Sequence, residues 1–215
     1  MTTCLYLIRH GESEWNHCGK YTGRQDISLS ALGRQQAEQI AHRLSGERIA
    51  AIYSSPLKRA QETAAPLARA HGLPVQLEPG LAEIHHGDWE GLTTSEVVER
   101  FPDEYAQWQT EPHRVQMPAG ESLDDVTRRS WAAFERIVAE QSGQTVVLSS
   151  HDAVIRVLLL QALGLPLAHF WKWRLENASL SMIESQAGPH LFRLALLNDT
   201  MHLRNLRAAL EKQAL

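Results

Sequence analysis

Arginine and histidine side chains follow three short apolar stretches of the sequence, and each stretch is typical of a buried strand. Arg9 and His10 end the first stretch, Arg59 lies one turn into the helix after the second, and His151 ends a later one. In open α/β sheets, ligands bind at the carboxyl ends of the strands. We therefore expect these four side chains to converge, with helix N-termini behind them that favour anions. In a chain with a net charge of −4, such a cluster of cations predicts a site for a phosphate-sized anion.

Strand-like and helix-like segments alternate along much of the chain, which is typical of parallel α/β winding. The expected strands cover residues 2–10, 50–55, 74–78 and 145–150. The expected helices run from an N-cap at Ser30 to about Leu44, from Ser55-Pro56 onward, from about Leu123 to Gln141, and from about Ala153 to Leu163. Residues 178–185 and 191–198 predict an antiparallel hairpin at one edge of the sheet. The expected fold class is therefore α/β with a largely parallel sheet and an antiparallel edge hairpin.

Residues 79–129 interrupt this alternation, because they are typical of loops and short helices and are rich in aromatic residues. A long insertion without strands is more often a lid or a substrate-side subdomain than a separate domain. We therefore expect a single domain over residues 1–215, with residues 79–129 as a lid or substrate-side insertion.

The composition excludes several classes of protein. Of the 215 residues, 43% are hydrophobic and 21% are charged, which fits a globular chain and not a disordered or collagen-like one. No long Lys/Arg run is present, so we expect no nucleic-acid partner. The most apolar window, residues 153–170, is broken by Arg156, Gly164 and Pro166, so we expect no membrane span. The two cysteines form no disulfide framework, and we expect a soluble, cytoplasmic protein.

Four sequence blocks carry a resemblance to a known family. They are LIRHGESEWN at residues 7–16, SSPLKRAQETA at 54–64, LAEIHHGDWEG at 81–91 and VVLSSHDAVIR at 146–156. Their order and content resemble the histidine phosphatase superfamily, the phosphoglycerate-mutase-like group. The resemblance spans nearly the whole chain, and it implies a single α/β domain with helices on both faces of a largely parallel sheet.

The resemblance also implies a role for individual residues. His10 matches the nucleophile that becomes phosphorylated, and Glu83 matches the proton donor. The implied ligands of the phosphoryl oxygens are Arg9, Arg59 and His151, with Asn16 as an additional phosphate ligand. These residue types suit the reaction, because a neutral imidazole can attack phosphorus in line while cations stabilise the charge on the equatorial oxygens.

The pair His85 and His86, beside acidic residues, raises the alternative of a metal site. Typical zinc spacings such as HExxH are absent, and the arginines that suit phosphate would repel a cation. We therefore expect metal-independent chemistry with no cofactor. The role of His85 stays open.

The substrate is expected to be a small phosphorylated metabolite. The stretch after the Glu83 block is shorter and more acidic than the basic, aromatic stretch of phosphoglycerate mutases, which favours a phosphatase. This region is most similar to the metal-independent phosphoserine phosphatases, in which histidines at the positions of His86 and His202 contribute to substrate recognition. The further expected substrate-binding residues are Thr22, Gly23, Arg24 and Asp152.

Other interpretations remain open at this point. The enzyme could act on α-ribazole 5′-phosphate or broadly on sugar phosphates, it could be a phosphoglycerate mutase, or it could be an inactive module that binds a phosphorylated ligand. Residues 168–173 and the terminal hairpin could form a homodimer surface, which the resemblance suggests, although core packing explains the same residues.

Overall fold

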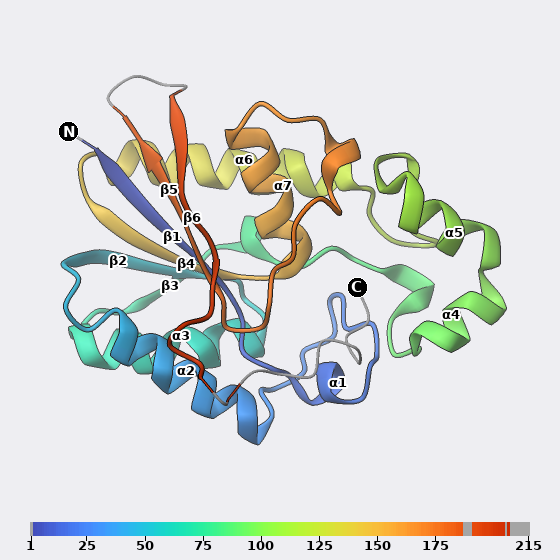
Figure 1. Cartoon of the computed structure of the whole chain (residues 1–215), viewed down its shortest axis with the longest axis horizontal. Helices are drawn as coiled ribbons and strands as arrows, with labels where there is room; N and C mark the ends of the chain where they lie inside the picture. Colours follow the sequence, from blue (N-terminus) through green and yellow to red (C-terminus); the bar gives the residue numbers. More distant parts are fainter. Residues whose placement is uncertain (1, 187–190, 205, 207–215) are drawn as a thin grey trace.

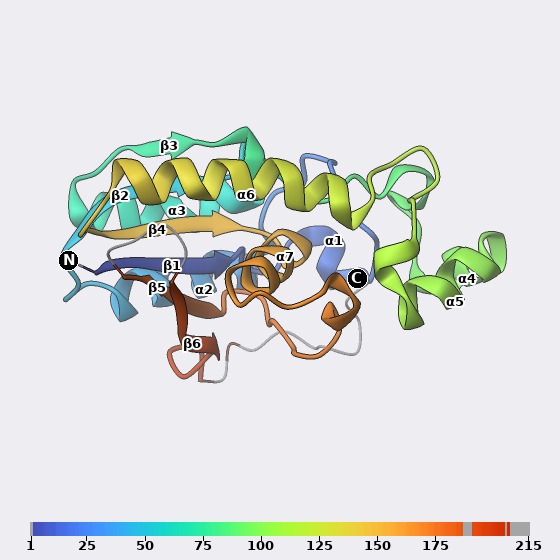
Figure 2. The ribbon, with the colours of Figure 1, turned by 90° about the horizontal axis from the view of Figure 1, so that it is seen from above.

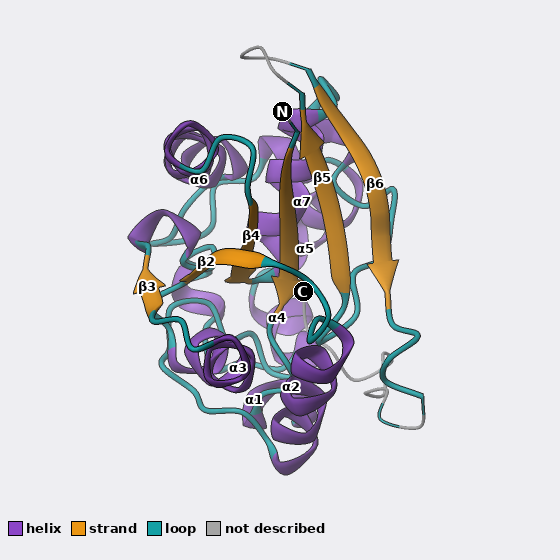
Figure 3. Ribbon diagram, turned by 90° about the vertical axis from the view of Figure 1, so that its left-hand side faces the viewer, coloured by secondary structure: helices purple, strands orange, loops and turns teal. Residues whose placement is uncertain are grey.

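In a computed structural model of the chain, a six-stranded sheet forms the centre of the molecule (Figure 1). The structure describes residues 2–186, 191–204 and 206. The strands are β1 (Thr3–Arg9), β2 (Ile49–Ser54), β3 (Val75–Leu77), β4 (Thr145–Ser150), β5 (Leu180–Ser185) and β6 (Phe192–Asp199). They lie in the order β3-β2-β4-β1-β5-β6, with β3 and β6 at the two edges (Figure 3). Strands β1 to β4 are parallel, and β5 is antiparallel to both of its neighbours, so the expected fold class is confirmed.

Helices cover both faces of the sheet. They are α1 (Glu14–His17), α2 (Ala31–Arg43), α3 (Lys58–His71), α4 (Thr94–Arg100), α5 (Pro102–Thr110), α6 (Leu123–Glu140) and α7 (Asp152–Ala162). Figure 1 shows α6 and α7 on one side of the sheet and α2 and α3 on the other. Alternate residues of β1 serve the two faces, because side chains point to opposite sides of a strand. Leu5 and Leu7 belong to the core beneath α6 and α7, whereas Tyr6 and Ile8 belong to the core over α2 and α3.

The capping residues in the sequence predict the start of α2 correctly, but not the start of α3. Ser30 caps α2, and its Oγ accepts a hydrogen bond from the Gly33 N–H at 3.0 Å, as the sequence predicts. Helix α3 begins at Lys58, so the predicted start at Ser55-Pro56 is wrong. The Ser55 hydroxyl accepts a hydrogen bond from the Leu57 N–H at 3.2 Å, and the backbone of Leu57 is extended. This turn keeps residues 55–57 out of the helix.

The segment between β3 and α6 contains no strand of the sheet, as expected. It contains α4, α5 and three short 3₁₀ turns, Pro79–Leu81, Gly87–Trp89 and Pro112–Arg114. Figures 1 and 2 both place α4 and α5 beyond the end of the sheet toward which the arrowheads of β1 and β4 point. A lid or substrate-side role for this insertion stays a prediction.

The C-terminal hairpin is formed by β5 and β6, and its turn at residues 187–190 lies outside the described residues. Among the helices that the structure describes, none has the length and apolar character needed to cross a bilayer.

Candidate active site

The parallel strands bring the predicted site residues to one edge of the sheet. Arg9 at the end of β1 is paired in register with Ser150 at the end of β4, and Ser54 of β2 is paired with Ser149. The residues that follow these strand ends must therefore lie together. His10 and His151 meet with their ring centroids 5.0 Å apart in an edge-to-face arrangement.

His10 is held in one orientation by two hydrogen bonds. Its Nδ1 lies 2.7 Å from the Gly11 carbonyl oxygen, and the Arg59 Nε–H lies 3.2 Å from its Nε2. A carbonyl can only accept and a guanidinium can only donate, so the proton of the neutral ring belongs on Nδ1 and the lone pair on Nε2. Burial, together with Arg59 and Arg9, lowers the pKa of His10 well below its ordinary value. Nε2 is therefore an unprotonated nitrogen available as a nucleophile.

Arg59 and Arg9 supply the positive charge. Arg59 donates from NH1 to the Gln25 carbonyl and from NH2 to the Gly23 carbonyl, both at 2.8 Å. Burial lowers the pKa of Arg59 to about 10, which still leaves it charged at neutral pH. Arg9 donates to the Leu175 carbonyl at 2.5 Å, and its Nε is buried without a hydrogen-bond partner among the described residues. Two buried guanidinium groups thus flank the His10 ring.

His151 and Asn16 are the other two predicted ligands of the phosphoryl oxygens, and that role stays a prediction. The Nε2 of His151 lies 2.7 Å from the Ser55 hydroxyl, and burial followed by the charge of Arg59 lowers its pKa well below the ordinary value. The Oδ1 of Asn16 accepts hydrogen bonds from the N–H and the hydroxyl of Ser13 at 3.1 and 2.9 Å. Because these bonds engage the oxygen, the amide NH₂ of Asn16 is the group that can donate to an anion.

Glu83 lies in the same buried region, and 8% of the surface of this residue is exposed. Its Oε1 accepts a hydrogen bond from the Ile84 N–H at 2.9 Å. Burial, and next the negative charge of Asp152, raises the pKa of Glu83 above its ordinary value. A carboxyl group with a raised pKa can hold a proton and deliver it at higher pH than an exposed glutamate.

The predicted substrate-binding loop has partners within the protein. The Thr22 hydroxyl lies 3.5 Å from the Lys20 carbonyl, and Gly23 presents its carbonyl to Arg59. Gly23 has a φ of +49°, and a Cβ there would lie 2.0 Å from Oε1 of Glu90, so only glycine fits this turn. The Arg24 guanidinium donates to Glu121 at 3.1 and 3.2 Å.

His86 and Asp152 line a small cavity beside Glu83. Its other walls are Trp108, Ala153, Phe170 and Trp171. The buried His86 ring packs against Tyr21, Trp89 and Trp108, and its Nδ1 has no hydrogen-bond partner in the described part of the chain. Asp152 bridges two arginines, with 3.5 Å to Arg9 NH1 and 2.6 Å to Arg156 Nε.

His202 is the remaining predicted substrate-binding residue. Its Nε2 lies 3.0 Å from the Ala178 carbonyl, and its ring lines an open hollow formed by α2, α3 and residues 201–204 and 206. The structure therefore brings ten of the predicted residues to one region around His10. The contact of His202 is with the backbone of Ala178, whose N–H donates to the His10 carbonyl at 3.0 Å. A substrate role for His202 stays a prediction.

Sequence analysis missed three charged residues that support this region. Arg156 is buried, donates to Asp152, and lies 5.0 Å from the Trp171 ring centroid. Its position four residues after Asp152 on an apolar helix was a usable signal, because residues at that spacing share a helix face. Arg129 and Glu121 bind residues near Glu83, and no local pattern marks them, since their partners lie elsewhere in the sequence.

No group of three or more His, Cys, Asp or Glu side chains within residues 2–186, 191–204 and 206 is arranged to hold a metal ion. The donors that converge on His10 are guanidinium and imidazole groups, which suit an anion.

The buried histidines predict a steep loss of stability in acid. Burial lowers the pKa of His86 to about 3, and the pKa values of His10 and His151 are also depressed. Between pH 6.5 and these lower values the unfolded chain binds protons that the folded chain does not, so the free energy of unfolding falls as pH falls. Each such histidine contributes about 1.4 kcal/mol per pH unit. Urea unfolding at pH 7, 6 and 5 measures this slope.

The His86→Gln variant isolates one of these contributions. Its slope should be shallower than the native slope by about 1.4 kcal/mol per pH unit below pH 6.5. The raised pKa of Glu83 makes the free energy of unfolding rise as pH falls, which is the opposite effect. Both proteins contain Glu83, so its contribution cancels in the difference between their slopes. His42→Gln, which removes an exposed ring of α2, is the matched control and should keep the native slope. Equal slopes for the native protein and His86→Gln would contradict the prediction.

Comparisons with known proteins agree with this geometry. A model of the histidine phosphatase superfamily, branch 1, matches residues 5–200. The chain is 41% identical over 199 residues to phosphoserine phosphatase 1 of Hydrogenobacter thermophilus, covering 93% of each chain. It is 37% identical over 162 residues to a metal-independent phosphoserine phosphatase of Arabidopsis thaliana, covering 74% of this chain and 68% of the relative. The structure of a mycobacterial glucosyl-3-phosphoglycerate phosphatase superposes with a TM-score of 0.86 at 30% identity, covering 93% of this chain and all of the other.

Proposed function

The chain belongs to the histidine phosphatase superfamily and is a metal-independent phosphatase, and on this premise we propose that it hydrolyses phosphoserine through a phosphohistidine on His10. The observation that carries the proposal is the fixed tautomer of His10, which leaves the Nε2 lone pair between two buried guanidinium groups. A phosphoryl group bound there would meet a nitrogen nucleophile and cationic groups for its oxygens at the same time.

The first step transfers the phosphoryl group to His10. Nε2 attacks phosphorus in line as the bond from phosphorus to the ester oxygen breaks, and Arg9, Arg59 and His151 stabilise the charge on the equatorial oxygens. The proton on Glu83 goes to the departing alkoxide, which leaves as an alcohol. The raised pKa of Glu83 supports this role, because the carboxyl must be protonated before the step.

The second step returns the enzyme to its starting state. Glu83, now ionised, takes a proton from water as the oxygen of that water attacks phosphorus. The bond from phosphorus to Nε2 breaks, phosphate leaves, and the electron pair returns to His10. Metal plays no part in either step, because the arginines carry the charge that a cation would supply.

The walls of the cavity beside Glu83 support a small, polar leaving group by their chemistry and not by the cavity's volume, which is about 10 Å³ and holds a single water. Trp108, Phe170 and Trp171 limit its size, while His86 and the Asp152 carboxylate add polar atoms. Serine carries an ammonium and a carboxylate, which a carboxylate and an imidazole N–H can recognise. Thr22, Gly23 and Arg24 contribute through the loop that holds Arg59. We also propose a cytoplasmic location, a homodimer and a role in serine biosynthesis.

Initial rates on four substrates test the proposed specificity. We expect kcat/KM for phosphoserine to exceed the values for α-ribazole 5′-phosphate, 3-phosphoglycerate and 4-nitrophenyl phosphate by at least about tenfold, since a site built for polar groups rejects ligands that lack them. The assays contain excess chelator, in which full activity is expected. A higher kcat/KM for α-ribazole 5′-phosphate, or similar kcat/KM values for all four substrates, would refute the phosphoserine assignment. Conversion of 3-phosphoglycerate to an isomer would instead favour a mutase.

A further inference from the structure

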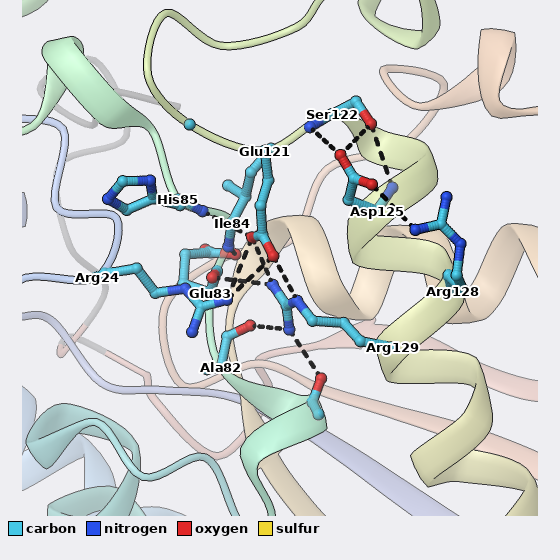
Figure 4. A network of polar contacts seen from close by, with 12 residues as sticks. Arg24, Ala82, Glu83, Ile84, His85, Glu121, Ser122, Asp125, Arg128 and Arg129 are labelled. Atoms are coloured by element: carbon cyan, nitrogen blue, oxygen red, sulfur yellow. Dashed lines mark hydrogen bonds and ion pairs between the residues drawn. The ribbon is translucent and has the colours of Figure 1, made fainter.

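The guanidinium group of Arg129, on α6, uses all five of its N–H donors, three of them on the segment that carries Glu83. Nε and NH2 donate to the two oxygens of Glu121 at 2.9 and 3.0 Å. NH1 donates to the carbonyls of Gly80 and Ala82 at 2.9 and 2.6 Å, and NH2 also donates to the carbonyl of Glu83 at 3.0 Å (Figure 4). A single side chain therefore binds three backbone carbonyls within four residues, the last of them belonging to Glu83 itself.

Glu121 holds the other end of the same segment. Its backbone N–H donates to the His85 carbonyl at 2.9 Å, and its Oε2 accepts from the His85 N–H at 2.9 Å. Burial alone would raise the pKa of Glu121, but the hydrogen bonds from Arg129 and His85 hold that pKa below its ordinary value. Glu121 is therefore ionised at neutral pH and keeps its pairing with Arg129, and residues 83–85 are fixed on both sides.

A second arginine joins this network to the loop that holds Arg59. Arg24 donates to both oxygens of Glu121, and the residues on either side of it, Gly23 and Gln25, accept hydrogen bonds from Arg59. The network made of Arg24, Glu121 and Arg129 thus lies between the residue that would bind the phosphoryl oxygens and the residue that would protonate the leaving group. Figure 4 shows Arg24 and Arg129 reaching Glu121 from different elements.

The carboxyl group of Glu83 depends on this network because its own side-chain bond is local. The hydrogen bond described for its carboxylate comes from the N–H of the next residue, Ile84. That bond moves with the backbone and does not fix the carboxyl relative to His10. The place of the carboxyl in the site is therefore set by where the backbone of residues 83–85 is held.

We propose that Arg129 is a positioning residue for the reaction, which sets the distance between the Glu83 carboxyl and the leaving oxygen by binding the backbone that carries Glu83. The inference rests on the proposed role of Glu83 as the proton donor. A shift of about 1 Å in such a group lowers the rate by about 10²-fold. In kcat/KM, which reports the steps up to departure of the leaving group, the loss should appear only where that group needs a proton.

Two variants of Arg129 test the proposal, each assayed on an alkyl phosphate and on 4-nitrophenyl phosphate. Arg129→Gln should lower kcat/KM for the alkyl substrate, phosphoserine, by roughly 30- to 100-fold and kcat/KM for 4-nitrophenyl phosphate by less than about threefold. Arg129→Lys keeps the charge but lacks the planar five-donor geometry, so a smaller loss in the same direction is expected. Arg128→Gln is the matched control, because Arg128 is the next residue on α6, is 76% exposed and pairs only with Asp125 in the ion pairs of the described residues.

A double-mutant cycle with Glu83→Gln supplies the second readout. If Arg129 acts through Glu83, Arg129→Gln should cost almost nothing more once Glu83 is replaced. Additive losses in the cycle, or equal losses of Arg129→Gln on both substrates, would overturn the proposal. Melting temperatures show whether Arg129→Gln is folded at the assay temperature. If it is not, the same double-mutant cycle with Glu83→Gln is measured with Arg129→Lys and with Arg24→Gln. Equal losses of Glu83→Gln on the two substrates would contradict the proposed role of Glu83 as the acid. A failure of the proposed function can therefore be distinguished from a failure of the inference about Arg129.

Discussion

Replacing His10 with alanine removes phosphate release, with an expected fall in kcat of at least about 10⁴-fold. The variant loses Nε2, the nitrogen that the hydrogen bonds of His10 with Gly11 and Arg59 keep unprotonated. The buried arginines remain, so the variant should still bind phosphorylated ligands. Initial rates on phosphoserine, with isothermal titration of the inactive variant, measure both effects. His42→Ala, on an exposed face of α2, is the control and should keep native activity.

Chemical trapping identifies the atom that carries the phosphoryl group. Native enzyme that is mixed with ³²P-labelled substrate and quenched with denaturant in base should hold label that base preserves and later acid treatment removes, and His10→Ala should hold none. Label that survives acid would place the intermediate on another residue type and contradict the role of His10. Native-level turnover by His10→Ala would do the same. Turnover by the native protein that is lost in this variant would exclude an inactive ligand-binding module.

Replacing Glu83 with glutamine should divide substrates by their leaving groups. Glutamine keeps the shape of the side chain but has no acidic proton, so kcat/KM for phosphoserine, which reports the steps up to departure of the leaving group, should fall by about 10²- to 10⁴-fold. The loss for 4-nitrophenyl phosphate should be much smaller, because nitrophenolate leaves without a proton. Steady-state rates on both substrates across pH 5 to 9 provide the measurement.

The matched control for this variant is Glu96→Gln, in the half-buried capping box of α4, which should leave both rates unchanged. Equal losses on the two substrates in Glu83→Gln would remove Glu83 as the acid. The pH profile adds a second check. The high-pH limb for phosphoserine should disappear in Glu83→Gln, since the native limb reports loss of the raised-pKa proton of Glu83.

The elements that carry the site could be predicted from the sequence because their signals are local. The strand that ends at Arg9, the Ser30 cap and the strand at residues 145–150 follow from apolar runs and capping residues, and the structure confirms them. The start of α3 could not be predicted in this way. Ser55 has the local signature of an N-cap, but its hydroxyl faces His151, a partner that lies 96 residues further along the chain.

The network around Glu83 was out of reach of the sequence for a similar reason. Arg129 lies on an amphipathic helix among other charged residues, and Arg128 beside it is a surface cation. Which of two adjacent arginines binds the carbonyls of residues 80–83 depends on the rotation of α6 against the sheet. That rotation is fixed by the packing of Val126, Phe134 and Ile137, so the distinction exists only in three dimensions.

The position of β4 between β1 and β2 also determines when the site can form during synthesis. When the ribosome has released β1, α2, β2, α3 and β3, the two strands that flank the centre of the sheet lack the strand that joins them. Their inner edges then offer unpaired N–H and C=O groups to any other chain nearby. Arg9 meets its register partner Ser150 only after residue 150 has emerged. The nascent first half is therefore both inactive and exposed to wrong pairing. Insertion of β4 joins β1 to β2, and the other edge of β1 is covered only when β5 pairs with it.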